Sequence, residues 1–127
     1  MGTKASISGL NTDHRQWLNH LSFYKDELNV LDDRLSEIAL KHEDRETLAW
    51  VNHFHNQFIV QRDEIEKLVH NIRIHDRQIE TTTGKLPRIM YEKAVEEYEE
   101  QKEEIERFEI LFDEMKDDLC TVLSDGL

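Results

Sequence analysis

The chain has 127 residues, a net charge of −12, one proline and four glycines. This length fits a single domain with a modest core, and so few turn residues argue against a fold of strands and hairpins. The negative charge argues against a nucleic-acid partner, which requires a basic face, and against binding to an anionic membrane surface.

The first eleven residues are small and polar and show no hydrophobic period, so we expect a flexible N-terminal arm over residues 1–11. Gly2 and Ser6 fit the short pattern for N-myristoylation, which specifies only these two positions. A single acyl chain anchors a protein weakly. Whether Gly2 is native or acylated stays open.

A first helix is predicted over residues 12–42, where apolar residues alternate in steps of four and three. Asn11, Thr12 and Asp13 provide N-cap chemistry at its start, and Asp13 and Gln16 have the spacing of a capping box. The apolar residues of this seam are Trp17, Leu21, Tyr24, Leu28, Leu31, Leu35 and Ile38.

A second helix is predicted over residues 45–80, with Asp44 as its N-cap. Its apolar residues recur every seven positions in a phase that differs from that of the first helix, which indicates a tight turn around residues 41–46. These residues are Val51, Phe58, Ile65, Ile72 and Ile79. Because no glycine or proline marks this turn, one continuous helix through it is the alternative.

A clear break follows at residues 81–87, which combine three threonines with Gly84 and Pro87. A third helix is predicted over residues 87–123, with apolar residues again spaced by three and four. Short connections place successive helices antiparallel. The predicted fold is therefore all-α: one elongated, antiparallel three-helix bundle over residues 12–124, with coiled-coil-like heptad seams.

Charge is distributed unevenly, since residues 88–118 carry a net charge of −8. The simplest interpretation is a solvated outer face that favours solubility. The alternative is a docking surface for a basic partner.

The seven histidines raise the question of a metal site, because helical bundles build such sites from Glu and His side chains. Neither a Glu-x-x-His nor a His-Glu-x-x-His motif occurs in the sequence. Heptad counting places His14 and His75 on the core seams at about the same height, opposite the small Ala94. A metal or a pH-sensitive contact there is the weaker hypothesis. The simpler one is two partly hydrated histidines with no metal and no cofactor.

No motif for catalysis is present, so we expect a protein that is not an enzyme. Cys120 is the only cysteine, which excludes an internal disulfide and favours a reducing, cytoplasmic location. No apolar stretch approaches the length of a membrane span. Gln61 and Gln101 interrupt the predicted seams and are interpreted as polar layers that fix helix register.

Several apolar residues lie off the seams, where an ordinary bundle would expose them to water. This predicted interaction face consists of Phe23, Val30, Trp50, Ile59, Val60 and Ile74. We therefore expect a helical interaction or assembly module that binds a second copy or another protein. The alternatives are a metal-binding bundle, acting as a sensor or an oxidase-like enzyme, and an acidic adaptor or chaperone for a basic partner.

Overall fold

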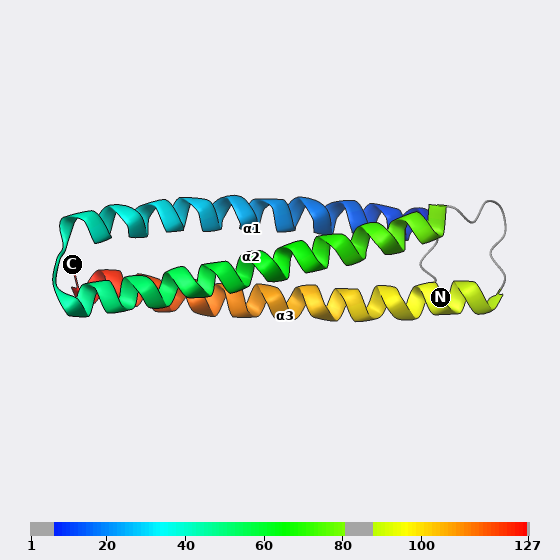
Figure 1. Cartoon of the computed structure of the whole chain (residues 1–127). Helices are drawn as coiled ribbons and strands as arrows, with labels where there is room; N and C mark the ends of the chain where they lie inside the picture. The colour runs from blue at the N-terminus through cyan, green and yellow to red at the C-terminus, as the bar shows by residue number, and fades with distance from the viewer. Residues whose placement is uncertain (1–6, 81–87, 127) are drawn as a thin grey trace.

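The computed structural model describes residues 7–80 and 88–126, which form three helices and no strand. Helix α1 covers Ile7–Lys41, α2 covers Arg45–Glu80 and α3 covers Arg88–Gly126. The three helices lie side by side along an elongated bundle (Figure 1). The all-α fold and the three-helix bundle predicted from the sequence are confirmed. Within the described residues, no helix contains a segment long and apolar enough to cross a membrane.

Contacts along α1 and α2 show that these two helices run in opposite directions. His14 near the start of α1 pairs with Asp76 near the end of α2, whereas Asp32 near the end of α1 pairs with His55. α3 runs alongside α1 in the same direction, as Figure 1 shows. The N-terminal end of α1 therefore lies beside the C-terminal end of α2 and the N-terminal end of α3.

The connection between α1 and α2 consists of residues 42–44 and is closed by hydrogen bonds. The backbone N–H of Thr47 donates to Oδ2 of Asp44 over 2.9 Å, and the Thr47 hydroxyl donates to the same oxygen over 2.6 Å. These bonds, that from the hydroxyl first, lower the pKa of Asp44. Asp44 is therefore the N-cap of α2, and the alternative of one continuous helix is wrong.

The predicted arm and first helix need one correction, because α1 begins at Ile7 and not at residue 12. Leu10 is fully buried in a cluster with Ile79 and Ala94 at this end of the bundle. Burying a leucine contributes about 1.5–3 kcal/mol, which favours extending the helix past the expected N-cap. Residues 1–6 and 81–87, and with them the myristoylation pattern and the Gly-Pro break, lie outside the described residues.

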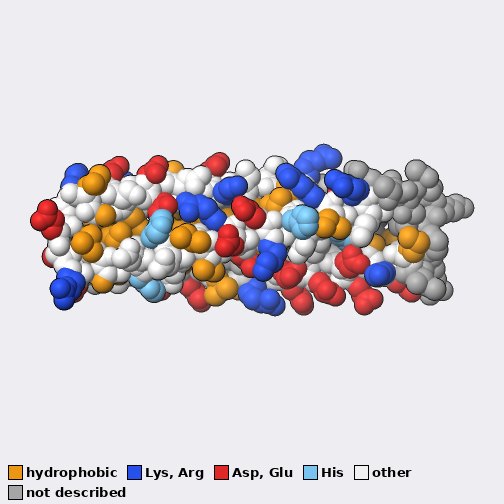
Figure 2. Space-filling model, in the orientation of Figure 1, with side chains coloured by type: hydrophobic (Ala, Val, Ile, Leu, Met, Phe, Trp, Pro, Cys, Tyr) orange, Lys and Arg blue, Asp and Glu red, His pale blue; other side chains and the backbone are white. Residues whose placement is uncertain are grey.

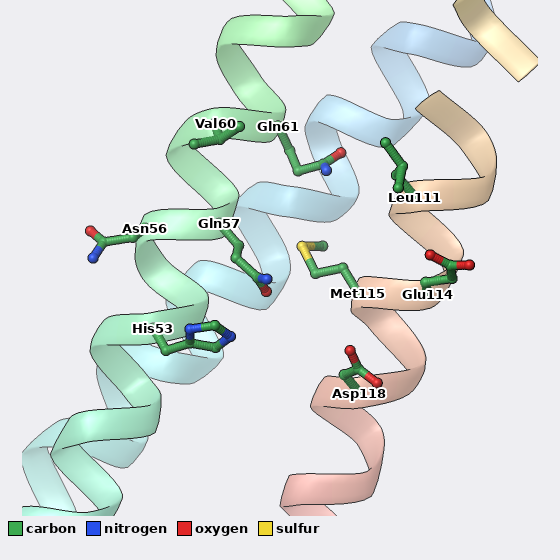
Figure 3. Close-up of a pocket in the computed structure, with 9 residues that line it drawn as sticks. All are labelled: His53, Asn56, Gln57, Val60, Gln61, Leu111, Glu114, Met115 and Asp118. Carbon is green, nitrogen blue, oxygen red and sulfur yellow. The ribbon is translucent and has the colours of Figure 1, made fainter. Parts of the chain in front are cut away.

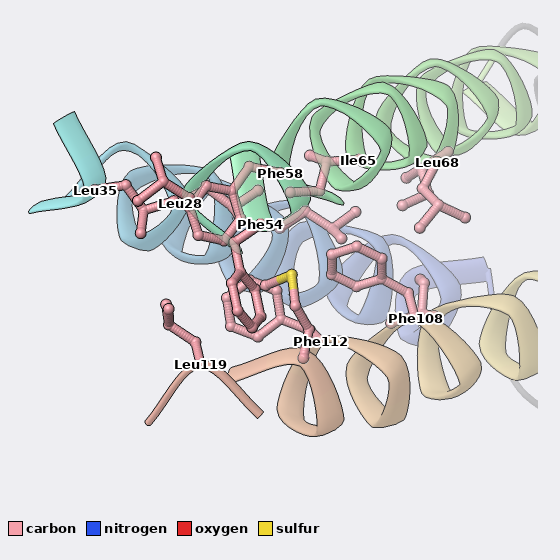
Figure 4. Close-up of a cluster of buried hydrophobic side chains, with 14 residues drawn as sticks. Leu28, Leu35, Phe54, Phe58, Ile65, Leu68, Phe108, Phe112 and Leu119 are labelled. Atoms are coloured by element: carbon pink, nitrogen blue, oxygen red, sulfur yellow. The ribbon is translucent and has the colours of Figure 1, made fainter. Parts of the chain in front are cut away.

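The main core runs along the axis and combines leucine, isoleucine and phenylalanine side chains from all three helices (Figure 4). Leu21, Leu28 and Leu35 contribute from α1, and they recur every seven residues. The remaining buried members are Val51, Phe54, Phe58, Ile65, Leu68 and Ile72 from α2, and Ile105, Phe108, Phe112, Met115 and Leu119 from α3. The predicted heptad positions therefore form the core of the bundle.

Candidate functional site

The first candidate site is a pair of buried histidines between α1 and α2. His14 is 1% exposed and His75 is 3% exposed. Their ring centroids lie 5.1 Å apart with an interplanar angle of 62°, so the edge of one ring faces the other. The expectation that both histidines lie at the same height in the bundle is confirmed.

Each histidine forms one hydrogen bond through Nδ1. In His14 this atom lies 3.0 Å from Oδ1 of Asp76, and in His75 it lies 3.2 Å from Oε1 of Gln101. Both partners are acceptors, so Nδ1 is the protonated nitrogen when either ring is neutral. Gln101 in turn donates from Nε2 to the carbonyl oxygen of Asn71 over 3.2 Å. The polar residue predicted to interrupt the seam of α3 therefore bridges α3 to α2.

The second ring nitrogen of each histidine, Nε2, lacks a hydrogen-bond partner among the described residues. Within the described part of the chain, Nε2 of His14 and Nε2 of His75 are buried and accept no hydrogen bond. Oε2 of Glu97 lies 3.6 Å from Nε2 of His75, beyond hydrogen-bond range but within reach of a protonated ring. Burial, and then the neighbouring His14, lowers the pKa of His75. The neutral form of His75 is therefore favoured in the folded chain.

Aromatic side chains surround the pair on the side of α1 and α3. The ring of Trp17 lies 5.5 Å from that of His14 and stacks on Tyr98 with a centroid distance of 5.1 Å. The Tyr98 hydroxyl donates to Oδ2 of Asp13. Burial, followed by this bond to Asp13, raises the pKa of Tyr98 to about 12. Asp13 thus joins α1 to α3 and does not act as a helix cap.

The prediction that Ala94 lies opposite the histidine pair is wrong. Ala94 packs one turn further along, with Leu10 and Ile79, and Tyr98 and Gln101 occupy the layer beside the rings. The residues that join α2 to α3 interrupt the heptad count, so counting leaves the axial offset of α3 undetermined.

The polar groups around the two rings are dispersed. Asp76 bonds to His14, whereas Glu97 lies beside His75. Among residues 7–80 and 88–126, no group of three or more His, Cys, Asp or Glu side chains is placed to hold a metal ion. The arrangement brings two buried imidazole rings together, with one carboxylate beside each ring.

The six residues of the predicted interaction face lie on different parts of the surface. Trp50 is half-buried and packs against the core. Phe23 and Val30 are each 64% exposed and lie seven residues apart on one edge of α1. Phe23 follows His20 by three residues and precedes Glu27 by four, and both of these side chains reach side chains of α3. We call Phe23 and Val30 the α1 strip.

Ile59, Val60 and Ile74, the other three residues from α2, point in two other directions. Ile59 lies between His55 and Arg62, which both bond to side chains of α1, so it flanks the boundary between α1 and α2. Val60 and Ile74 instead line hollows between α2 and α3. The predicted face is therefore not one continuous surface.

The second candidate site is the groove between α2 and α3, which the sequence did not reveal (Figure 3). Its volume is about 400 Å³ at the level of Val60 on α2 and Leu111 on α3. The other lining residues are His53, Asn56, Gln57, Gln61, Glu114, Met115 and Asp118. A second hollow of about 350 Å³ lies between the same two helices and includes His75 and Gln101.

The surface around this groove is mixed in character. Figure 2 shows hydrophobic side chains gathered over the half of the molecule nearest the turn between α1 and α2, while acidic side chains follow the edge formed by α3. Val60, Leu111 and Ile110 are among the exposed hydrophobic residues. The acidic helix predicted from the sequence thus borders apolar surface and is not purely a solvated face.

Comparison of the chain with protein-family models, with curated proteins and with solved structures finds no match to any of them.

Proposed function

We propose that this protein is a non-enzymatic helical interaction module that associates with a second copy of itself through the α1 strip. The observation that supports this proposal is the pair Phe23 and Val30, which are both 64% exposed on a helix whose other face is fully packed. Scattered exposed hydrophobic residues are ordinary on protein surfaces. Two of them at heptad spacing on one edge form the seam that a further helix can cover.

The local chemistry around the α1 strip favours a contact between protein surfaces. The rings of Phe23 and Tyr24 lie 6.1 Å apart, so the exposed ring continues an aromatic cluster that reaches the core through Phe108 and Phe112. An aromatic side chain held by its neighbours loses little rotamer freedom when a partner covers it. Phe23 is therefore the residue expected to contribute most to the contact.

The test replaces both strip residues by aspartate. Phe23→Asp with Val30→Asp removes the apolar contact and adds two charges, so we expect an oligomer to become a monomer in multi-angle light scattering at unchanged helicity. The matched control is Leu40→Asp with Ile110→Asp, which changes two exposed apolar residues elsewhere on the bundle. A wild-type chain that is already monomeric at high concentration contradicts the proposal, as does an oligomer that both double variants leave intact.

The histidine pair supports a second, weaker candidate, a metal-binding bundle. Its supporting observation is that Nε2 of His14 and Nε2 of His75 are both buried and form no hydrogen bond within the described chain, since this nitrogen is a common metal ligand. Equilibrium dialysis with Zn²⁺ tests it directly. Stoichiometric uptake that His14→Ala with His75→Ala abolishes supports this function, and no uptake by the wild type contradicts it.

A further inference from the structure

The groove between α2 and α3 has apolar walls that no other part of the described chain covers. Val60 on α2 and Leu111 on α3 stand at its rim and are both at least half exposed. Met115 points across the floor toward α2 (Figure 3). A groove with apolar side chains at its rims and in its floor is the shape in which an amphipathic helix binds.

The floor also carries polar groups that lack partners. Gln57 and Gln61 extend from α2 into the groove (Figure 3). Within the described residues, the side-chain oxygen of each is buried and accepts no hydrogen bond. A buried oxygen without a donor is costly, so these two amides gain a hydrogen bond if they turn toward an N–H donor of a bound partner.

The charged side chains that line the two hollows are all acidic, apart from the histidines. Glu114 and Asp118 line the first hollow, whose lining includes no lysine or arginine. Glu97, Glu100 and Glu104 line the second hollow, which also lacks both basic residue types. The two hollows follow each other between the same pair of helices. The carboxylates of each hollow therefore favour positively charged side chains in a bound partner.

We propose that this groove binds a basic amphipathic helix of a partner protein. The apolar face of that helix lies on Val60, Leu111 and Met115. Its lysine or arginine side chains lie opposite the carboxylates of α3 and reach the amides of the floor. Binding completes a four-helix arrangement and buries apolar surface that is now exposed.

The charge of this chain argues for a different protein as the occupant. Each of the three helices carries net negative charge, and α3 carries most of it. A second copy would therefore bring like charges to the groove, which costs free energy across an interface. The partner helix instead has the opposite sign.

This inference rests on the proposed function as an interaction module but uses a surface separate from the α1 strip. Variants of the groove should leave self-association intact, and variants of the strip should leave helix binding intact. The failure of one proposal can therefore be told apart from the failure of the other.

The probe is a synthetic helical peptide of about 21 residues, or three heptads, with leucines on one face and lysines beside them. Its control peptide carries glutamate in place of every lysine. Isothermal titration measures the Kd, and amide chemical shifts from NMR locate the site. We expect the lysine peptide to bind with a Kd that weakens as salt is added, and to shift Val60, Leu111 and Glu114 most.

The decisive variants carry the same charge change at two places on α3. Leu111→Lys with Glu114→Lys alters the groove, whereas Ile110→Lys with Asp117→Lys alters exposed positions outside it. We expect the groove pair to weaken binding about tenfold or more, and the control pair about twofold or less, because only the first places charge against the bound peptide. Circular dichroism checks that both remain helical.

Three results would overturn the proposal. The lysine peptide fails to bind, the glutamate peptide binds equally well, or both lysine double variants weaken binding to the same extent. The last of these would mean that the peptide responds to the overall charge of α3 and not to the groove.

Discussion

His14 on α1 and His75 on α2 contact each other edge to face in the core, and each uses Nδ1 to reach a side-chain oxygen that accepts a hydrogen bond. The pair is joined by Asp76 from α2 and by Glu97 and Gln101 from α3. A core layer of this kind fixes helix register when it is neutral. It also makes stability sensitive to protonation.

Acidification should destabilise the bundle through His75. Its folded-state pKa is lowered from 6.5 by burial and by His14, so the unfolded chain binds the proton more readily. The contribution of neutral His75 is complete above about pH 6.5 and is lost as the pH falls through the lowered pKa. For one proton the slope is at most about 1.4 kcal/mol per pH unit.

This effect is measured by urea unfolding of the wild type and of His75→Leu between about pH 7.5 and pH 5, the range in which histidine titrates. The variant should lose part of the pH dependence. The control is His70→Leu on the exposed side of α2, which should keep the wild-type dependence. Equal slopes for the wild type and His75→Leu would show that His75 does not couple folding to pH.

Truncating a phenylalanine should lower the free energy of unfolding far more at a buried position than at an exposed one. Phe58 is fully buried within the main core, whereas Phe23 is 64% exposed. Phe58→Ala should cost about 3–5 kcal/mol of unfolding free energy because it leaves a cavity. Phe23→Ala should change it by about 0.5 kcal/mol or less, as measured by urea unfolding at low protein concentration. A large loss at Phe23 would mean that this residue is already covered in the folded protein.

Tyr24 and Tyr98 should lose their hydroxyl protons at a higher pH than an ordinary tyrosine. Burial and neighbouring acids, Glu109 for Tyr24 and Asp13 for Tyr98, raise both pKa values to about 12. Because the folded-state pKa lies above the ordinary value of 10.0, the contribution of each neutral phenol is present below about pH 10 and is lost as the pH rises toward about 12.

The measurement is an ultraviolet titration of phenolate absorbance, followed in parallel by circular dichroism. Replacement of both residues by phenylalanine, Tyr24→Phe with Tyr98→Phe, should remove the late part of the titration and flatten the loss of helicity above about pH 10. A double variant that retains the late phenolate signal would contradict its assignment to Tyr24 and Tyr98.

The sequence predicts the helices well where periodicity and capping agree. The bounds of α2 follow from the phase shift around Asp44 and from the threonine-rich break, and the predicted residues 45–80 match the observed helix. The start of α1 could not be placed, because Leu10 belongs to a small cluster at the end of the bundle. Its burial depends on Ile79 and Ala94, which are distant in the sequence.

The candidate sites could likewise be predicted only where they do not depend on contacts between residues that are distant in the sequence. The histidine pair was predictable because both residues continue core seams whose relative height follows from a short turn. The hydrogen-bond partners of the pair were harder to predict, because Asp76 adjoins His75 in the sequence yet bonds to His14. The groove depends on the axial offset of α3 relative to α2, which periodicity does not fix. Only this offset brings Leu111 opposite Val60.

Self-association is measured by native mass spectrometry of the purified chain over a range of protein concentrations. We expect a dimer or a larger oligomer with no added mass, which Phe23→Asp with Val30→Asp converts to a monomer. A wild-type chain that stays monomeric at every concentration would contradict it.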